Sequence, residues 1–305
     1  RLYHSDNWSK KMSEISQYTE SLHEECGVFG MYDKTGETDM VSAVYSALYA
    51  LQHRGQESCG IALNVDGVLS GYRDLGLVSE VFTKRVLEEL PRGAKMATGH
   101  VRYATAGQRS RSNAQPMVLH HCKGAMAVCH NGNLVNAPKL RRKLEMSGSI
   151  FHGTSDTEVI AYLLTQNRLL TPNIEMAVSR TMDDIEGAYS LVIMTHTKLI
   201  AARDPNGFRP LCIGKLPEGR GWVVSSETCG LDIVGAEYVR DVEPGEIVRF
   251  NKEGVTSEQG VEPPSRACRG RHGHDLGHIV DLVAVIRGHA RERVIEIAYA
   301  VGPGK

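Results

Sequence analysis

The sequence predicts an α+β fold in which short antiparallel strands outnumber helices. Glycine accounts for 31 of the 305 residues, which is above average usage and indicates many tight turns. The segment IALNVDGVLSGYRD alternates around Asp66 and Gly67, a dipeptide that supplies the positive φ angles of a hairpin turn. Beyond Gly187, short turns separate apolar runs that predict three to five further strands: AYSLVIMT, LIAARD, PLCIGK, WVVSSE and GEIVRF.

The first third of the chain mixes strands with amphipathic helices. The apolar segment CGVFGMYD, which begins at Cys26, predicts a strand, and apolar residues at helical spacing predict a helix over residues 41–52. A second apolar stripe, which ends at Pro91, predicts a single helix over residues 78–90. These helices follow strands closely, as expected for elements that cover the face of a sheet.

The middle of the chain contains two strands that end in polar turns. They are predicted over residues 95–105 and 124–131, and the loop between them contains NAQP. A helix is predicted over residues 137–146. Ser155 and Glu158 have the spacing of a capping box ahead of helical residues 159–164, in which each side chain satisfies the main-chain amide of the other.

Charge and hydropathy exclude several classes of protein. The 35 Lys and Arg residues nearly balance the 36 Asp and Glu residues, so the net charge of -1 predicts no nucleic-acid or membrane partner. No apolar run of 18 residues is present to span a bilayer. The seven cysteines are scattered and odd in number, which favours free thiols in a reducing, cytoplasmic location.

Composition divides the chain into three parts. Residues 1–25 are polar and lack the apolar core of a secretory signal, so we expect a leader or propeptide there. Residues 26–261 carry the predicted strands and helices and form the expected domain. Residues 262–305 are rich in arginine and histidine, an abrupt change of composition that indicates an atypical tail.

Several polar residues near strand ends describe a pocket for an α-amino acid with a reactive side-chain carbonyl. Arg102 offers a fork of donors for a carboxylate, and Asp156 offers an acceptor for an ammonium group. Asn131 and Gly132 have the donors of an oxyanion hole, and Cys26 supplies a nucleophile.

Each of these residues also has a structural alternative. A cysteine at a strand start is commonly a small buried side chain, and an arginine in a turn commonly forms a surface ion pair. An Asn-Gly pair is commonly only a turn, and an Asp beside a helix start commonly complements the helix dipole. Sequence alone leaves both interpretations open for each residue.

Nine ordered blocks resemble the glutaminase domain of the amidophosphoribosyltransferase family. The resemblance extends from about residue 25 to residue 261. Its general pattern is shared with other class II glutamine amidotransferases of the N-terminal nucleophile hydrolase group. The blocks are ECGVFG, LQHRGQES, GHVRYATAG, NAQP, HNGNLVN, SDTE, GAYSLV, RDPNGFRPL and SSETCGLDIVGAEYVRDVEPGE.

The resemblance implies a fold, an activity and a set of site residues. The fold is a four-layer αββα sandwich of two antiparallel sheets between helical layers. The activity is hydrolysis of glutamine to glutamate and ammonia, which full-length relatives use to convert phosphoribosyl pyrophosphate to phosphoribosylamine in purine synthesis. Cys26 is the nucleophile and, once the leader is removed, its α-amine is the base; Asn131 and Gly132 form the oxyanion hole. The implied substrate-binding residues are Arg102, Asp156, Thr105 and Arg54, although Arg54 also suits a structural ion pair.

Cofactors and partners are implied only for the full-length protein. Family members use Mg²⁺ with phosphoribosyl pyrophosphate in a transferase domain that residues 262–305 do not resemble, and they form homo-oligomers. Many also carry a 4Fe-4S cluster, for which Cys268 is a candidate ligand, but one thiolate cannot hold a cluster. No cofactor is therefore expected in this chain.

Other hypotheses remain for the tail and for the function. The tail is an out-of-frame terminus on a fragment, or a genuine metal-binding segment that uses His272, His274 and His278. The chain itself is an active glutaminase, the glutaminase half of an enzyme like glucosamine-6-phosphate synthase, or a catalytically silent truncated fragment.

Overall fold

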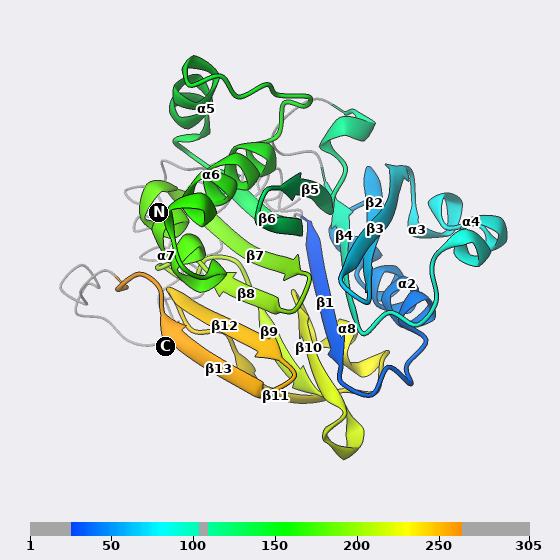
Figure 1. Ribbon diagram of the computed structural model, residues 1–305. Coiled ribbons are helices and arrows are strands. Elements are labelled where there is room, and N and C mark those ends of the chain that lie inside the picture. The colour runs from blue at the N-terminus through cyan, green and yellow to red at the C-terminus, as the bar shows by residue number, and fades with distance from the viewer. Residues whose placement is uncertain (1–25, 104–108, 264–305) are drawn as a thin grey trace, which may run out of the picture.

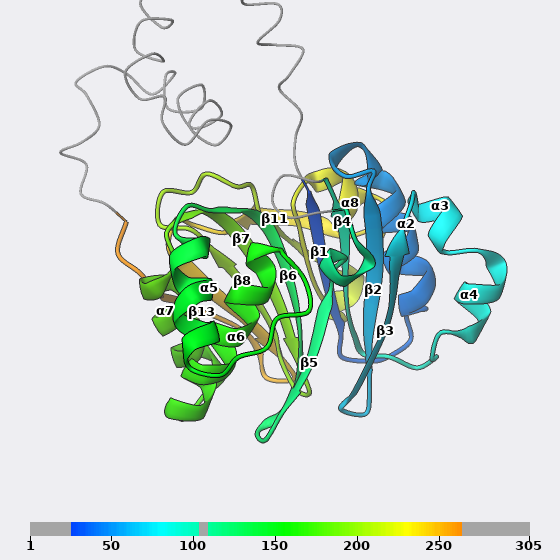
Figure 2. The same ribbon diagram turned by 90° about the horizontal axis from the view of Figure 1, so that it is seen from above.

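The computed structural model describes residues 26–103 and 109–263, which form two antiparallel sheets stacked face to face. In Figure 2 the helices lie outside this pair of sheets, with α5, α6 and α7 on one side and α2, α3 and α4 on the other. The predicted four-layer αββα sandwich is confirmed. Among the described residues, no helix is long and apolar enough to cross a membrane.

The first sheet has seven strands in the order β11-β9-β10-β1-β4-β2-β3, and the second has six in the order β13-β12-β8-β7-β6-β5 (Figure 1). The strands of the first sheet are β1 (Gly27–Asp33), β2 (Ser58–Val65), β3 (Val68–Leu75), β4 (Met96–Arg102), β9 (Cys212–Lys215), β10 (Gly221–Ser225) and β11 (Glu237–Asp241). Those of the second sheet are β5 (Met117–His121), β6 (Gly124–Leu134), β7 (Gly187–Thr195), β8 (Leu199–Arg203), β12 (Glu246–Asn251) and β13 (Gly254–Gln259).

Helices cover the outer face of each sheet. The first sheet packs against α2 (Met40–Ala50), α3 (Val78–Val81), α4 (Lys84–Glu89) and α8 (Thr228–Asp232). The second sheet packs against α5 (Ala137–Met146), α6 (Asp156–Leu170) and α7 (Ile174–Asp184). Short 3-10 helices are formed by Gln52–Arg54, Arg111–Asn113 and Pro217–Gly219.

Three apolar clusters fill the three spaces between the four layers. One lies between the first sheet and its helices, one between the second sheet and its helices, and one between the two sheets. Along β1, Val28 points into the cluster between the sheets and Phe29 into the outer cluster. Because both faces of the central strands are buried, strands such as β1 and β7 are mainly apolar on both faces instead of alternating with polar residues.

The β2–β3 hairpin is confirmed, whereas the single helix over residues 78–90 is wrong. Asp66 and Gly67 have φ angles of 50° and 88°, as the predicted turn requires. Residues 78–90 instead form α3 and α4, with a break at Phe82 and a new N-cap at Thr83. The apolar stripe that predicted one helix is nevertheless buried, because the side chains of both short helices pack against the same cluster.

The capping box ahead of α6 is also wrong. Ser155 occupies the N-cap position, but its side chain makes no capping hydrogen bond. The Glu158 carboxylate accepts instead from the main-chain N–H groups of His152 and Gly153, each at 2.8 Å. The Ser155 N–H donates to Asn113, which lies 42 residues away in sequence, so a tertiary contact replaces the local one.

Elements that sequence analysis missed are short, exposed or charged. Strands β11 and β13 lie at the sheet edges, and most of their residues are exposed, so their sequences show no apolar alternation. Strand β5 and helices α7 and α8 were also not predicted. Seven strands therefore follow Gly187 where three to five were expected.

Asp33, the last residue of β1, anchors the turn before α2. Its buried carboxylate accepts four hydrogen bonds of 2.6 to 3.0 Å from the main chain and hydroxyls of Thr35 and Thr38. Burial alone raises the pKa of Asp33, but the hydrogen bonds from Thr38 and Thr35 outweigh it and lower the pKa from 3.8 to about 2.

This pKa shift predicts a pH-dependent loss of stability. Because the folded-state pKa is depressed, the contribution is complete above about pH 4 and is lost as the pH falls towards 2. At roughly 1.4 kcal/mol per pKa unit, Asp33→Asn should lower the free energy of unfolding by about 2 kcal/mol at pH 7. Urea unfolding at pH 7 and pH 3 should show that the difference from wild type shrinks at pH 3; a difference independent of pH would contradict this account.

Candidate active site

The layer between the two sheets changes from apolar to polar at one end. Side chains alternate between faces along a strand, so every second residue of β4 and β6 points into this layer. On β4 the apolar Met96 is followed by Thr98, His100 and Arg102, all buried. On β6 the apolar Ala127 and Cys129 are followed by Asn131. These positions gather buried polar groups at one end of the sandwich.

Cys26 lies at this end, immediately before β1, and is held from two sides. The N–H of Tyr103 donates to its Sγ at 3.4 Å, and the Tyr103 carbonyl lies 3.6 Å from the same sulfur. The Arg54 side chain donates through Nε to the Cys26 carbonyl at 2.7 Å. Cys26 is 5% exposed and has a φ of 59°, which is unusual for a residue with a side chain. The main chain and the thiol are therefore both fixed.

Arg54 is buried and ion-paired, as its structural alternative predicted. Its Nη1 contacts the Glu227 carboxylate, which also contacts Nε2 of His53 at 3.1 Å. Burial lowers the pKa of Arg54, and the charge of Glu227 opposes that shift. Burial also acts to raise the pKa of Glu227, but the charges and hydrogen bonds of Arg54 and His53 together outweigh it, so the pKa is lowered. Sequence analysis missed Glu227, whose only signal was its place in the SSETC block.

Arg102 forms an ion pair with Glu57, and both side chains are almost completely buried. Glu57 was also missed, although it lies in the LQHRGQES block. The predicted anchor for a substrate carboxylate therefore already has a carboxylate partner within the protein. Thr105 lies outside the described residues, so the structure does not place it.

Asn131 and Gly132 lie near the end of β6. Asn131 is fully buried, and neither polar atom of its side chain has a hydrogen-bond partner among the described residues. Gly132 has a φ of 151°, and a Cβ there would lie 2.0 Å from the Ala188 carbonyl oxygen, so only glycine fits. Since buried polar groups are normally paired, the Asn131 amide has the capacity to bind a ligand atom.

Asp156 is the first residue of α6 and points back to β6. Its carboxylate accepts from the N–H of Leu134 at 3.0 Å and lies 3.5 Å from Nδ1 of His130. Burial alone raises the pKa of Asp156, but His130 and the main-chain donors outweigh it, so the pKa is lowered. Asp156 therefore links α6 to the end of β6, the strand that carries Asn131. Its position in the first turn of α6 also places its negative charge favourably for the helix dipole.

Metal binding has no candidate in the described part of the chain. No group of three or more His, Cys, Asp or Glu side chains is placed there to hold an ion. Cys268 and the three histidines at 272, 274 and 278 lie outside the described residues, so the hypotheses that concern them remain untested.

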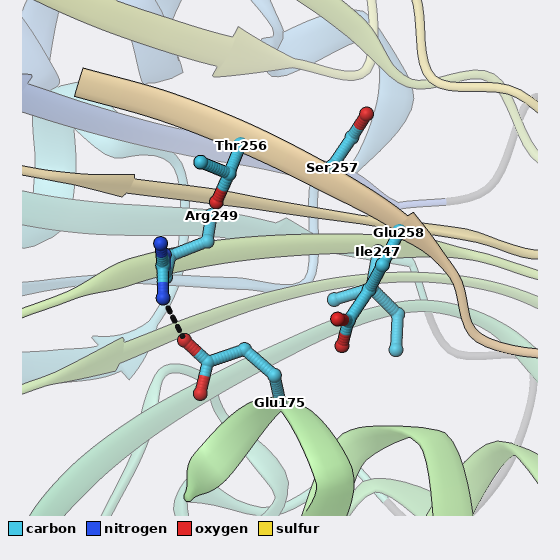
Figure 3. A pocket seen from close by; sticks show the side chains of 6 residues that line it. All are labelled: Glu175, Ile247, Arg249, Thr256, Ser257 and Glu258. Carbon is cyan, nitrogen blue, oxygen red and sulfur yellow. Dashed lines mark hydrogen bonds and ion pairs between the residues drawn. The ribbon is translucent and has the colours of Figure 1, made fainter.

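A separate pocket lies between α7 and strands β12 and β13 (Figure 3). Glu175 points towards Arg249 there, and the two side chains form an ion pair at 3.1 Å. Lys198 contacts the same Glu175 oxygen at 2.7 Å. The lining residues of this pocket include no cysteine and no asparagine that could serve as the predicted nucleophile and oxyanion donor, so the polar end of the inter-sheet layer is the better candidate active site.

Comparisons with known proteins concern the domain as a whole. Residues 100–232 match the family described as "Glutamine amidotransferase domain". Among curated proteins, the chain is 45% identical over 239 residues to an amidophosphoribosyltransferase of Bacillus subtilis, covering 78% of this chain and 48% of that protein. It is 46% identical over 244 residues to amidophosphoribosyltransferase 2, chloroplastic, of Arabidopsis thaliana, covering 80% and 42%.

Solved structures give the same match. The glutamine phosphoribosylpyrophosphate amidotransferase of B. subtilis, solved with ADP and GMP, superposes with a TM-score of 0.70 at 42% identity, covering 77% of this chain and 49% of that one. A structure described as the allosteric regulatory enzyme of purine biosynthesis superposes with a TM-score of 0.71 at 43% identity, with the same coverage. The chain thus spans about half the length of the curated relatives it matches.

Proposed function

The chain contains a glutamine amidotransferase domain of the amidophosphoribosyltransferase type, with the fold of N-terminal nucleophile hydrolases, and we propose that it hydrolyses glutamine to glutamate and ammonia. One observation carries the proposal. Cys26, whose sulfur and main chain are both held, lies at the same end of the inter-sheet layer as the buried side-chain amide of Asn131, which has no hydrogen-bond partner among the described residues.

The proposed reaction begins once Cys26 is the first residue. Its free α-amine, with a reference pKa of about 7.7 to 8.0, takes the proton of the thiol. The thiolate attacks the glutamine carboxamide, and Asn131 and Gly132 donate to the tetrahedral oxyanion. The same amine then returns this proton to the carboxamide nitrogen, the C–N bond breaks and ammonia leaves. Water hydrolyses the remaining thioester, which releases glutamate and regenerates the thiol. An internal Cys26 has an amide nitrogen instead of an amine, so activity requires removal of residues 1–25.

Arg102 and Asp156 are proposed to bind the α-carboxylate and α-ammonium groups of glutamine, and Thr105 to line the same pocket. Arg102 would bind the substrate carboxylate either in addition to Glu57 or in place of it. Because the pKa of Asp156 is lowered, its carboxylate is ionised at neutral pH and attracts an ammonium group. Arg54 is proposed to act on the nucleophile through the Cys26 carbonyl, because its side chain contacts that group.

The activity of the whole protein is a further part of the proposal. Relatives twice as long are named amidophosphoribosyltransferases. In a full-length protein of that kind, the ammonia released here would convert phosphoribosyl pyrophosphate to phosphoribosylamine, the first step of purine synthesis. We propose that the remaining half of such a full-length protein binds phosphoribosyl pyrophosphate and Mg²⁺. We propose that it also contributes the contacts of a homo-oligomer.

An iron-sulfur cluster does not fit the described residues. Such a cluster needs four cysteines in one place. Cys59, Cys129 and Cys212 lie on separate buried strands, and no three ligands meet. We propose that any cluster would use cysteines outside the described residues. The six described cysteines form no disulfide bond with one another, which supports a reducing location such as the cytoplasm.

Intact mass and a glutaminase assay test the proposal together. We expect chains that begin at Cys26 to release glutamate and ammonia from glutamine, and chains that retain residues 1–25 to be inactive. The control is circular dichroism, which establishes that both forms are folded. A folded chain that begins at Cys26 and does not hydrolyse glutamine would overturn the proposal and favour a catalytically silent fragment.

A further inference from the structure

The edge of β6 that carries the oxyanion residues is only partly covered by its neighbouring strand. Strand β5 pairs with β6 from His121 opposite Gly124 as far as Met117 opposite Val128. The preceding residue, Pro116, has no N–H with which to continue the ladder. Strand β6 nevertheless runs on to Leu134, so its last residues extend past the end of β5.

The side chain of Gln115 takes the place of the missing strand. Extending the β5–β6 register by two more residue pairs, beyond Met117 opposite Val128, sets residue 115 opposite His130. Oε1 of Gln115 accepts from the His130 N–H at 2.7 Å, and its Nε2 donates to the His130 carbonyl at 3.3 Å. A primary amide has the same acceptor and donor as a peptide group. Gln115 is 3% exposed, so water does not compete readily for these contacts.

His100 reinforces the same carbonyl from the first sheet. Its Nε2 lies 2.9 Å from the His130 oxygen. Because a carbonyl oxygen only accepts, this nitrogen must carry the proton. Burial lowers the pKa of His100 to about 3, so the ring is neutral at physiological pH. Two neutral donors from different segments thus converge on one main-chain oxygen.

The His130 carbonyl belongs to the same planar peptide group as the N–H of Asn131. Fixing the plane of this peptide restricts the orientation of the Asn131 side chain. It also restricts the orientation of the next peptide group, which carries the Gly132 N–H. Misplacing a catalytic donor by about 1 Å is sufficient to reduce a rate by roughly 100-fold. The supports of His130 are therefore placed to control the oxyanion hole.

We propose that Gln115 is a positioning residue for glutamine hydrolysis, which holds the His130–Asn131 peptide, together with His100, so that Asn131 and Gly132 point at the oxyanion. This inference rests on the proposed function. It assigns no contact between Gln115 and the substrate: Gln115 acts through the main chain of β6.

The test compares Gln115→Met with Asn64→Leu in the full chain, after intact mass has established the N-terminus. Methionine has the length of glutamine but cannot replace its hydrogen bonds. Asn64 is the matched control, because it is also 3% exposed and also bonds main-chain groups with both ends of its amide, at Thr195 and Gly67. The measurements are kcat and KM for glutamine and the inhibition constants of two compounds, glutamate γ-semialdehyde and glutamate. The aldehyde would form a thiohemiacetal with Cys26, and its oxygen would occupy the oxyanion hole, whereas glutamate forms no such adduct.

We expect Gln115→Met to lower kcat by about 10- to 100-fold while KM changes less than about threefold. The affinity for the aldehyde should fall by a similar factor, whereas that for glutamate should not change. Asn64→Leu should keep kcat near the wild-type value. A kcat in Gln115→Met within about twofold of wild type, or an equal loss in Asn64→Leu, would overturn the proposal.

Amide hydrogen exchange separates this inference from the proposed function. If the wild-type chain begins at Cys26 and has no glutaminase activity, the proposed function fails, but exchange still reports the contact. We expect faster exchange at His130, Asn131 and Gly132 in Gln115→Met and not in Asn64→Leu. Unchanged exchange at these three amides would overturn the positioning role whatever the activity.

Discussion

Replacing Cys26 with alanine is expected to abolish glutamine hydrolysis, with a decrease in kcat of at least about 10⁴-fold. Alanine removes the sulfur that forms the thioester but leaves the α-amine and the oxyanion donors in place. The assay is glutamate release by the chain that begins at residue 26. A glutamine analogue with a γ-diazoketone should add once to the wild-type chain and not to Cys26→Ala, as measured by intact mass.

The other described cysteines are poor substitutes for Cys26. Burial raises the pKa of the Cys59, Cys129 and Cys212 thiols to about 12, so they remain protonated at neutral pH. Cys122 is exposed, and Cys122→Ser is a suitable control that should retain full activity and labelling. Substantial hydrolysis by Cys26→Ala would contradict the assignment of the nucleophile.

Replacing Arg102 with leucine should have the second largest effect, because it removes two interactions at once. Loss of the buried partner leaves the Glu57 carboxylate uncompensated, which should lower the free energy of unfolding by about 3 to 5 kcal/mol. Loss of the proposed carboxylate anchor should raise KM for glutamine by about 10- to 100-fold. Urea unfolding and steady-state kinetics measure the two effects separately.

The double variant Glu57→Leu/Arg102→Leu separates the structural role of Arg102 from its role in substrate binding. It contains no unpaired buried charge, so we expect most of the lost stability to return. KM should remain high, because no guanidinium is present to bind the α-carboxylate. Recovery of both stability and KM in the double variant would mean that Arg102 acts only as the partner of Glu57.

The sequence predicted the positions of the candidate site better than the contacts within it. Cys26 was predicted to begin the first strand and lies immediately before β1, and Arg102 lies within the strand predicted over residues 95–105 and is the last residue of β4. Asn131 and Gly132 lie further along β6 than the predicted strand end, because β6 continues to Leu134. The carboxylates that pair with Arg54 and Arg102 were missed, since Glu227 lies 173 residues from Arg54 in sequence.

Local patterns were informative only where local interactions decide the structure. The Asp66-Gly67 turn was correct because its two positive φ angles depend on those two residues. The Ser155–Glu158 capping box failed because Asn113 and the residue 152–153 backbone provided better partners. The helix predicted over residues 78–90 is two helices in the structure, with a break at Phe82. The apolar side chains of both helices are still buried against the first sheet, so the apolar pattern did not reveal the break.

The sequence by itself determined the mixture of strands and helices, the Asp66-Gly67 hairpin and which polar residues stand at strand ends, because apolar alternation and turn residues act over a few positions. The order of the layers was predicted from the resemblance to known glutaminase domains. Only the tertiary structure decided how those residues are held. Gln115 faces His130 because β5 stops at Met117, and His100 reaches the same carbonyl because the two sheets stack face to face. Such contacts depend on strand register and sheet packing, which join residues distant in sequence and leave no periodic signal along the chain.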